Sequence, residues 1–511
     1  MRYIISEIRI RPGEGSEELE KAVLKKLKRK NLRIGDIKIR KESIDARRKP
    51  NVRLVYTVEF SCNERLDLKE ASDSFYISPR GSRKALRPVV AGFGPCGIFA
   101  ALILAEAGLE PLVLERGRPV DERREDVRKF WEGGPVNPES NVQFGEGGAG
   151  TFSDGKLTTG IKDVRKEKVL RELAAAGADE SIMYRQKPHI GTDRLGDVVK
   201  NMRKKIEALG GEILFNTRLD DMETDRRDEE TALKGLVISE GKGGERFHRE
   251  IEACCLILAS GHSGRDTFEM LKRRKVLMEQ KPFSIGVRVE HPQRLINRVQ
   301  YGREELAEIL GAAEYKLSYR SSGGRGVYTF CMCPGGYVIN ASSAEREAVT
   351  NGMSMSARDG ERANSGLLVD VRTCDFPGED PLAGVEFQRK YEGLAWENGG
   401  GRLPKSSYGA FRRDREDPVR RSLPQFASEA IIEAMPFLGE RLRGFDRAET
   451  VFTAVETRSS SPVRVKRDDT FQASIRGLFP AGEGAGYAGG IMSAAVDGIK
   501  AAEKMIEEYY R

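Results

Sequence analysis

No run of the sequence reaches the roughly 20 apolar residues that a membrane-spanning helix needs, because the longest apolar stretches are shorter or are interrupted by Gly and Pro. The N-terminus, MRYIISEIRI, alternates charged with apolar residues and therefore lacks the apolar segment of a signal peptide. The seven cysteines are an odd number and do not have the spacing of a small disulfide-bonded domain. These absences predict a soluble protein of the cytoplasm with reduced thiols.

The length and the charge set broader limits. At 511 residues the chain is too long for one ordinary hydrophobic core, so two or three domains are expected. The 86 basic and 79 acidic residues leave a net charge of +7, a mild excess over a densely charged surface. This excess favours anionic ligands but does not by itself indicate nucleic acid.

The most informative stretch covers residues 89–117. A short apolar run at residues 89–91 fits a buried parallel strand, and Gly92, Gly94 and Gly97 follow it as G-x-G-x-x-G where a helix should begin. In this pattern the first glycine permits a tight turn, the second lets the backbone approach a pyrophosphate, and the third lets the helix pack closely on its strand. The N-terminus of that helix would then face the phosphates with free N–H groups.

The segment after these glycines completes the pattern. A helix is expected at residues 98–107 and a second parallel strand at residues 111–115. This strand ends in Glu115, 18 residues after Gly97, near the offset of roughly 20 residues expected for an acid that accepts hydrogen bonds from a ribose. Because strand, glycines, helix, strand and acid occur in register, the region predicts a dinucleotide site.

Two more glycine-rich stretches fit the same ligand. In residues 145–157 the dense glycines would let backbone amides approach a flat ligand, although a flexible loop remains the alternative. A buried strand at residues 254–259 ends at small residues, which let a ligand approach its edge. Residues 477–490 are a strand that runs into glycines, and the helix expected at residues 491–509 would aim its positive dipole end at the same cleft.

Three motifs, at residues 89–117, 256–264 and 477–498, match in order those of the glutathione-reductase-like FAD-binding fold. More closely, GGAGTFSDGKL at residues 147–157, KPFSIG at 281–286 and PAGEGAGYAGG at 480–490 resemble the bacterial FAD-dependent dehydrogenases called NAD-utilising, which carry a small N-terminal domain. One departure is Gly482-Glu483, where many relatives in the broad fold carry Gly-Asp.

The resemblance implies a non-covalently bound FAD and places its parts on the chain. The first three glycines would lie at the pyrophosphate, Glu115 at the adenosine ribose, Glu483 at the ribityl chain, and Gly490 with Ile491 at the flavin pyrimidine. The full set of cofactor contacts expected in this way is Gly92, Gly94, Pro95, Gly97, Glu115, Arg116, Gly147, Gly148, Thr151, Gly261, Gly482, Glu483, Gly490 and Ile491.

The chain is expected to have the α/β fold class with three parts. A Rossmann-like FAD-binding domain, made of a parallel sheet and a β-meander, would occupy residues 87–280 and 446–511, and an antiparallel-sheet substrate domain would be inserted at residues 281–445. Residues 1–86 read as a small N-terminal α+β domain of ferredoxin-like β-α-β-β order, with strands at 3–10, 34–40 and 52–60 and a helix from Ser16.

Candidates for the working face of the flavin are less specific. Ser153 and Lys156 follow the glycine loop, and Arg458 precedes the last flavin motif, so a cation from either stretch could stabilise anionic flavin or orient an anionic substrate. Cys331 and Cys333 would share one face of a strand. Core packing is favoured over a redox pair, and no metal site is expected because two further zinc ligands are missing nearby.

The sequence therefore predicts an FAD-dependent dehydrogenase that transfers hydride or electrons to or from an unknown small molecule. NAD(P)H is a candidate donor, although Gly261-His262-Ser263-Gly264 is not a second complete nucleotide fingerprint. The alternative is an RNA-associated flavoprotein, or a flavin-binding module without turnover. It would use the basic helix that carries Lys21, Lys25, Lys26, Lys28, Arg29 and Lys30, but nucleic acid is not expected because no aromatic platform accompanies these charges.

Overall fold

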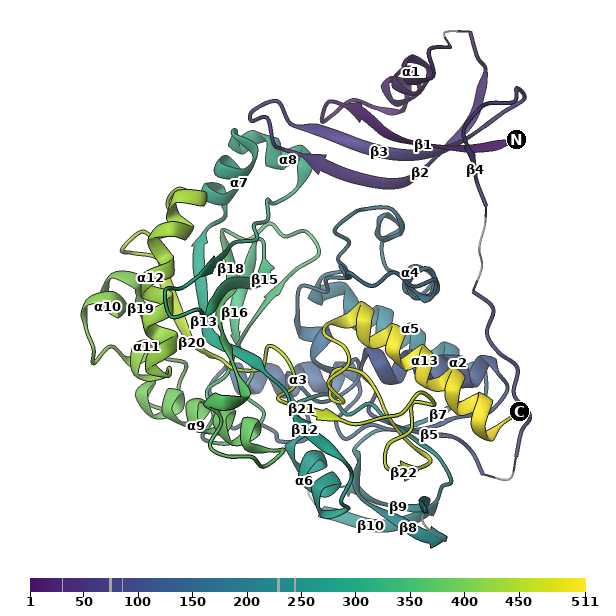
Figure 1. The fold of residues 1–511 in the computed structure, drawn as a ribbon, viewed down its shortest axis with the longest axis vertical. Coiled ribbons are helices and arrows are strands. Elements are labelled where there is room, and N and C mark those ends of the chain that lie inside the picture. The colour runs from purple at the N-terminus through teal and green to yellow at the C-terminus, as the bar shows by residue number, and fades with distance from the viewer. Residues whose placement is uncertain (30, 73–75, 85, 228–229, 243–244) are drawn as a thin grey trace.

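The computed structural model describes residues 1–29, 31–72, 76–84, 86–227, 230–242 and 245–511 (Figure 1). Its central layer is a five-stranded parallel sheet with the order β23-β11-β5-β6-β7. Each of the five strands is only three residues long. They are β5 (Val89–Ala91), β6 (Leu112–Leu114), β7 (Glu212–Leu214), β11 (Leu256–Leu258) and β23 (Leu478–Pro480).

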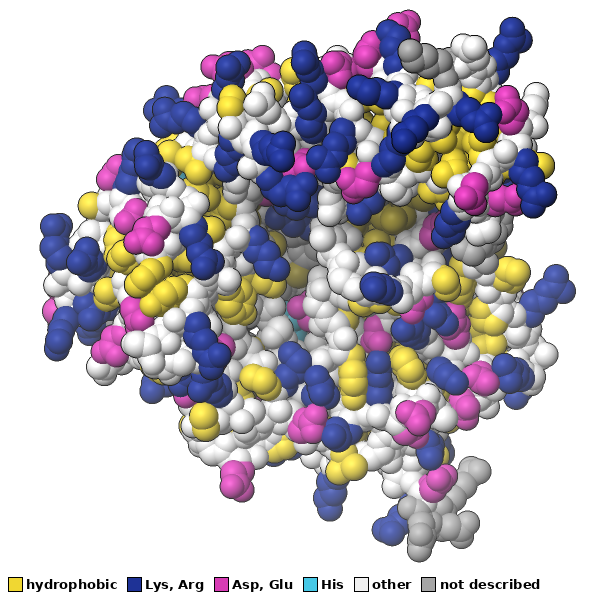
Figure 2. All heavy atoms as spheres, turned by 45° about the horizontal axis from the view of Figure 1, so that its top comes forward, with side chains coloured by type: hydrophobic (Ala, Val, Ile, Leu, Met, Phe, Trp, Pro, Cys, Tyr) yellow, Lys and Arg dark blue, Asp and Glu magenta, His cyan; other side chains and the backbone are white. Residues whose placement is uncertain are grey.

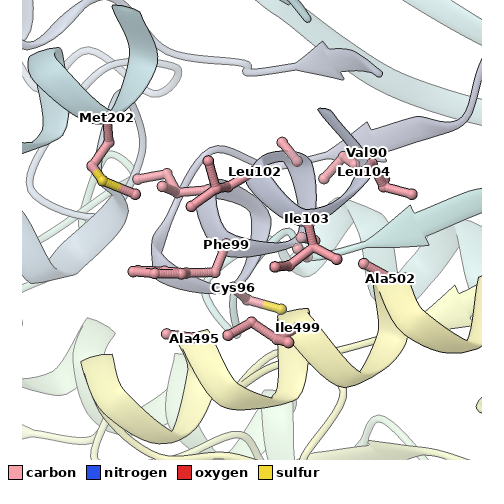
Figure 3. Close-up of a cluster of buried hydrophobic side chains, with 14 of the residues drawn as sticks. Val90, Cys96, Phe99, Leu102, Ile103, Leu104, Met202, Ala495, Ile499 and Ala502 are labelled. Carbon is pink, nitrogen blue, oxygen red and sulfur yellow. The ribbon is translucent and has the colours of Figure 1, made fainter. Parts of the chain in front are cut away.

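Helices cover one face of this sheet. Helix α2 (Pro95–Glu106) packs along α13 (Ile491–Tyr509), and Cys96, Phe99 and Ile103 point toward Ala495, Ile499 and Ala502 (Figure 3). The two helices approach so closely that a Cβ at position 498 would lie 2.1 Å from the Cys96 carbonyl oxygen, and Gly498 permits this approach because it has no side chain. Helix α2 begins at Pro95, three residues earlier than predicted, since proline is well suited to a first helical turn.

The remaining helices near this sheet are α3 (Val120–Trp131), α4 (Arg165–Ala175), α5 (Thr192–Ala208) and α6 (Arg265–Arg273). Short 3₁₀ segments occur at Gly148–Phe152 and Glu180–Met183. The sequence predicts Thr192 or Asp193 as the cap of α5, because both residue types commonly cap helices. This prediction is wrong: Gly191 occupies the cap position, the Thr192 hydroxyl donates to the Thr151 carbonyl, and Asp193 accepts from Ser356.

An antiparallel meander covers the other face of the parallel sheet. It comprises β8 (Thr217–Arg227), β9 (Glu230–Lys242) and β10 (Glu245–Glu252), and β22 (Ile475–Arg476) pairs with β9. From the sequence, residues 213–217 are expected to form one strand and residues 241–244 a glycine turn. Residues 213–217 instead span the junction of β7 and β8, which belong to different sheets. Residues 243–244 of the expected turn lie outside the described part of the chain.

A second large sheet forms the other half of the cavity-bearing region. It has six antiparallel strands in the order β14-β15-β18-β13-β20-β19. Its central strand β13 is buried from Phe283 to His291, so the alternating sequence of this strand does not produce an exposed face. The strands are β13 (Phe283–Pro292), β14 (Ser318–Arg320), β15 (Gly326–Cys333), β18 (Arg362–Val371), β19 (Lys405–Ser407) and β20 (Val451–Glu456).

Helices lie outside this sheet in Figure 1, and β16 and β17 lie on its other side, toward the parallel sheet. The strand β20 comes from beyond residue 445, where the end of the inserted domain was expected. The helices are α7 (Gln293–Tyr301), α8 (Ala307–Leu310), α9 (Ala383–Asn398), α10 (Tyr408–Arg413), α11 (Pro418–Arg421) and α12 (Gln425–Arg441), with 3₁₀ turns at Glu304–Leu306 and Thr373–Asp375. The small pairs are β16 (Gly336–Asn340) with β17 (Thr350–Ser354) and β12 (Met278–Gln280) with β21 (Val463–Val465).

The N-terminal sheet has its own core and lies at the top of Figure 1. Its strand order is β2-β3-β1-β4, so β3 is inserted between two strands that helix α1 connects, which is a split β-α-β unit. The elements are β1 (Arg2–Ile10), α1 (Ser16–Leu27), β2 (Ile34–Asp45), β3 (Arg53–Cys62) and β4 (Lys69–Glu70). The predicted α/β class, with its parallel sheet, meander, antiparallel sheet and N-terminal α+β unit, is thus confirmed.

Within the described residues, no helix combines the length and the apolarity that crossing a membrane requires.

Candidate functional site

A cavity of about 430 Å³ lies where the carboxyl ends of the parallel strands meet the six-stranded sheet. The turn between β5 and α2, the ends of β6 and β11 and the start of α13 line one side of it. Residues of β15, β17 and β20 line the other side. In open parallel sheets a ligand crevice is expected at this edge of the strands.

Glycines leave the space that a ligand would fill. Gly94 has φ −86° and ψ −174°, and a Cβ added there would meet only Gly148 Cα at 3.6 Å. A Cβ at Gly261, Gly489 or Gly490 would meet nothing within 4 Å. Packing against the protein therefore does not require glycine here, although the left-handed backbone of Gly261 (φ +70°) and Gly490 (φ +86°) favours it. The missing side chains of these four glycines form a cradle at the cavity wall.

Two helix N-termini point into this cradle. Helix α2 begins at Pro95 and α13 at Ile491, and both residues line the cavity. The first N–H groups of a helix have no partner within the helix, and the N-terminus carries a partial positive charge. The cavity therefore offers two anion-binding ends, which suits a dinucleotide with a pyrophosphate and an electron-accepting ring.

Glu115 lies at the cavity but is already engaged by the backbone. Its Oε1 accepts from the N–H groups of Gly117 at 2.9 Å and Gly145 at 3.0 Å, and its Oε2 accepts from the Phe93 N–H at 2.8 Å. The carboxylate thus joins the first glycine turn to the second glycine loop. One acceptor position on Oε2 stays open for the predicted ribose hydroxyl.

The structure brings most of the predicted cofactor residues together at the cavity. Those that line it are Gly92, Gly94, Pro95, Glu115, Arg116, Gly148, Gly261, Glu483, Gly490 and Ile491. The others, Gly97, Gly147, Thr151 and Gly482, lie behind the wall. There a Cβ at Gly97 would lie 1.8 Å from the Gly92 carbonyl oxygen, and the Gly482 N–H donates to Asp497 at 2.7 Å. Their direct contact with a cofactor stays a prediction.

The flavin-face candidates Ser153, Lys156 and Arg458 also line the cavity. The Ser153 hydroxyl donates to the Gly150 carbonyl at 2.7 Å, and the Lys156 ammonium donates to the Met332 carbonyl. The Ser153 hydroxyl therefore makes a hydrogen bond within the glycine loop, and the Lys156 ammonium joins this loop to β15. Lys156 remains the cation that the glycine loop contributes to this wall.

Arg458 is tied into a buried ionic network and does not present a free charge. Its guanidinium lies 2.7 Å from Glu347 and 3.0 Å from Glu392, and Arg265 approaches the same two carboxylates at 2.7 Å each. The sequence gives no hint of this pairing, because Arg458 and Glu347 are 111 residues apart in the chain. The network joins α6 and α9 to the end of β20.

A second buried cation, not predicted from the sequence, lies next to the cavity. Arg288 is fully buried in β13, and its Nε lies 2.6 Å from Oε2 of Glu456, a cavity-lining residue of β20. Further bonds run from Arg288 to the Cys331 carbonyl at 2.9 Å and to the side chain of Asn351 at 2.9 Å. A charged residue within the apolar strand sequences FSIGVRVE and VFTAVE was the available signal.

Glu483 and His262 form a weakly polar corner of the cavity, with 3.8 Å between Nε2 and Oε1. Burial raises the pKa of Glu483 to about 7, against the opposing effects of the Gly490 N–H and Lys281. Burial, followed by the nearby Arg458 and Arg265, lowers the pKa of His262 to about 3. At neutral pH the histidine is therefore neutral, and the carboxyl group titrates.

This raised pKa predicts a pH-dependent stability. The fold favours the protonated carboxyl group of Glu483 over the charged one. The contribution of this protonated group to stability is therefore complete below the unfolded pKa near 4.5, and it is lost as the pH rises through about 7. We expect the FAD-free Glu483→Gln variant to match the wild type at pH 4 and to exceed it by about 2 kcal/mol in free energy of unfolding at pH 8. Urea unfolding at both pH values measures this, and a difference that does not change with pH would contradict it.

Sequence comparisons relate two segments of the chain to family models and the whole chain to one relative. Residues 282–459 match the family model described as "FAD-dependent protein, C-terminal domain-like", and residues 1–61 match a domain of unknown function. This match relates residues 282–459, which include part of the cavity wall opposite the glycine cradle, to the C-terminal domain of FAD-dependent proteins. An uncharacterized protein of Clostridium beijerinckii is 44% identical over 541 residues, covering 100% of this chain and 99% of that protein. The chain belongs to the same family as this clostridial protein.

Solved structures show only weak overall similarity. The flavin-dependent halogenase CmlS is 12% identical with a TM-score of 0.39, and the match covers 84% of this chain but 59% of the halogenase. A geranylgeranyl bacteriochlorophyll reductase-like protein of Thermoplasma acidophilum is 15% identical, with a TM-score of 0.37 and coverage of 83% and 79%. A flavoprotein/dehydrogenase of Cytophaga hutchinsonii is 14% identical, with a TM-score of 0.34 and coverage of 83% and 77%.

Proposed function

We propose that the protein is an FAD-dependent dehydrogenase that passes hydride or electrons between a non-covalently bound FAD and a small-molecule substrate, with NAD(P)H as a candidate donor. The observation that carries the proposal is the glycine cradle, which two helix N-termini face from one wall of the cavity. Residues 282–459 contribute to the opposite wall of the cavity, and their match to an FAD-dependent family also supports the proposal. When bound, FAD would supply the hydride-transfer chemistry of the reaction.

The residues of the chain would divide the cofactor between them. Gly94 and the first turn of α2 would hold the pyrophosphate, and Glu115 with Arg116 would hold the adenosine end. Glu483 and the first turn of α13 would lie at the flavin end. The substrate would enter against β15, β17 and β20, so the six-stranded sheet would exclude water from the reacting atoms and determine which molecule fits.

The test is the absorption spectrum of the purified protein, followed by anaerobic bleaching with NADH, NADPH and candidate substrates. A stoichiometric FAD spectrum that bleaches with one of these reductants supports the proposal. A folded protein that binds no FAD, even after reconstitution, contradicts it. FAD that is bound but is not reduced by any of these donors leaves the flavin-binding module as the better description.

A charged side chain near the flavin would change the midpoint potential of the flavin. We expect Lys156→Met to make the flavin harder to reduce by about 30 mV, which corresponds to about 1.4 kcal/mol of lost stabilisation of the reduced anion. Lys162→Met is the matched control, because Lys162 is exposed and does not line the cavity. Equal potentials in the two variants and the wild type would remove Lys156 from the flavin face.

Association with RNA receives little support from the N-terminal unit. Residues 1–86 carry 22 Lys and Arg against 13 Asp and Glu, and basic side chains are prominent in the upper half of Figure 2. On α1, however, Lys21 pairs with Glu18, and Lys26 donates to the Ser6 carbonyl. Arg29, just beyond the helix, pairs with Glu64. Lys30 lies outside the described residues. These internal pairings reduce the charge available to phosphates, so the dehydrogenase is the function that we propose.

A further inference from the structure

A β-bulge places two cysteines at the cavity. In the pairing of β15 with β18, Phe330 lies opposite Gly366 and Cys333 lies opposite Asn364, so β15 has one extra residue at this point. Cys331 takes up the extra residue with a φ of +42°, a left-handed conformation that costs a side-chain-bearing residue about 1 kcal/mol or more. The bulge therefore interrupts the strict alternation of the strand at the Cys-Met-Cys segment.

The two thiols have different surroundings. Cys331 lines the cavity, whereas Cys333 is completely buried behind it. The Cys333 thiol donates to the Cys331 carbonyl oxygen at 3.4 Å. The Cys331 side chain thus lies at the proposed flavin space, and the Cys333 thiol lies against the backbone of Cys331. Attack of one thiol on a disulfide and resolution by its neighbour need this arrangement.

Two cationic side chains donate hydrogen bonds to the backbone of the Cys-Met-Cys segment. Arg288 donates to the Cys331 carbonyl at 2.9 Å, and Lys156 donates to the Met332 carbonyl. The hydrogen bond from Cys333, followed by the charges of Arg288 and Lys156, lowers the pKa of the Cys331 thiol against the opposing effect of burial. Hydrogen bonding to Cys331 and burial raise the pKa of Cys333. These surroundings favour the thiolate form at Cys331 and the neutral thiol at Cys333, the combination expected of a reactive dithiol.

A metal site and simple core packing both fit the cysteine pair less well. Among the residues that the structure describes, no group of three or more His, Cys, Asp or Glu side chains is placed to hold a metal ion. Core packing accounts for Cys333 but does not account for a strained Cys331 at the cavity wall beside buried cations. Cys254 and Cys255, whose sulfur atoms lie 4.0 Å apart, do not line the cavity and provide an internal comparison.

We propose that Cys331 and Cys333 are a dithiol–disulfide couple that exchanges two electrons with the FAD of the proposed function, on which this inference rests. In the oxidative direction the two thiols lose two S–H bonds and gain one S–S bond. Their two electrons and two protons reduce one FAD to FADH₂. In the reverse direction FADH₂ returns both electrons and both protons, and the S–S bond opens. The substrate class would be a thiol or disulfide compound that reaches Cys331 from the cavity.

The test counts electrons. Air-oxidised protein with bound FAD is titrated anaerobically with dithionite while the flavin absorbance is followed. We expect the wild type and the control Cys254→Ser to consume about four electrons per FAD, and Cys331→Ser and Cys333→Ser to consume about two, because a flavin and a disulfide each accept two. Two electrons per FAD in the wild type would overturn the proposal.

A second readout does not need the flavin. The peptide with Cys331 and Cys333 from the air-oxidised protein, digested without reductant after its free thiols are blocked, should carry an internal disulfide. It should take up blocking reagent only after reduction. Blocking of both thiols before reduction overturns the couple, whether or not FAD is bound. Absence of FAD with an intact disulfide would instead count against the proposed function, so the two failures are distinguishable.

Discussion

The Gly94→Val variant is expected to purify without FAD while keeping its fold. Valine adopts the backbone conformation of Gly94 readily, because φ −86° and ψ −174° are extended values. An added Cβ would meet only Gly148 Cα at 3.6 Å, so the protein itself accommodates the first added atom. The branched side chain would instead fill the space of the pyrophosphate. We expect a loss of about 3 kcal/mol or more, roughly a 100-fold weaker affinity for FAD.

Fluorescence titration of the FAD-free proteins measures this loss, and circular dichroism with thermal unfolding reports whether the variant is folded. Gly160→Val is the matched control, because Gly160 is exposed and a Cβ there meets nothing within 4 Å. The control should bind FAD as the wild type does. Stoichiometric FAD in a well-folded Gly94→Val protein would sink the assignment of this glycine to the pyrophosphate.

The Arg458→Met variant should be strongly destabilised rather than altered only in its flavin. Methionine would leave Glu347 and Glu392 with Arg265 as their remaining partner in the network, and Glu392 is completely buried. Removing one partner of a buried ion pair typically costs about 3 to 5 kcal/mol, because an uncompensated charge remains in the interior. Denaturant unfolding of the FAD-free variant should show a loss of this size.

Two comparisons separate this cost from a general effect of losing arginine. Arg389→Met removes pairs with Glu269 and Glu386 that are about 40% or more exposed, and it should change the stability by less than about 1 kcal/mol. Adding Glu392→Gln to Arg458→Met should recover part of the loss, since the buried charge disappears with its partner. If Arg458→Met is as stable as Arg389→Met, the network does not carry the stability that its geometry indicates.

Features that depend on neighbouring residues could be predicted from the sequence. The first glycine turn, the parallel strands beside it and the start of α13 all follow from short motifs. Within them, the spacing of the glycines reports how closely two backbone segments or a ligand can approach. The close approach of Gly97 to the Gly92 carbonyl oxygen is an example of such local information, because the two residues belong to the same turn. The same local information failed at the start of α5, where Gly191 and the contact with residue 356 replaced the predicted cap.

By itself, the amino-acid sequence determined the α/β class, predicted the edge of the sheet where a dinucleotide would bind, and supplied most of its own cofactor candidates from residues that line that edge. Only the tertiary structure decided that Arg458 is neutralised by Glu347 and Glu392, that Arg288 lies beneath the cavity, and that Cys331 turns toward it. These features depend on which strands pair and in which register, and on residues brought together from 40 to more than 160 positions apart. Contacts over such separations leave no periodic pattern in one chain, because many pairings of the same strands would satisfy the same local preferences.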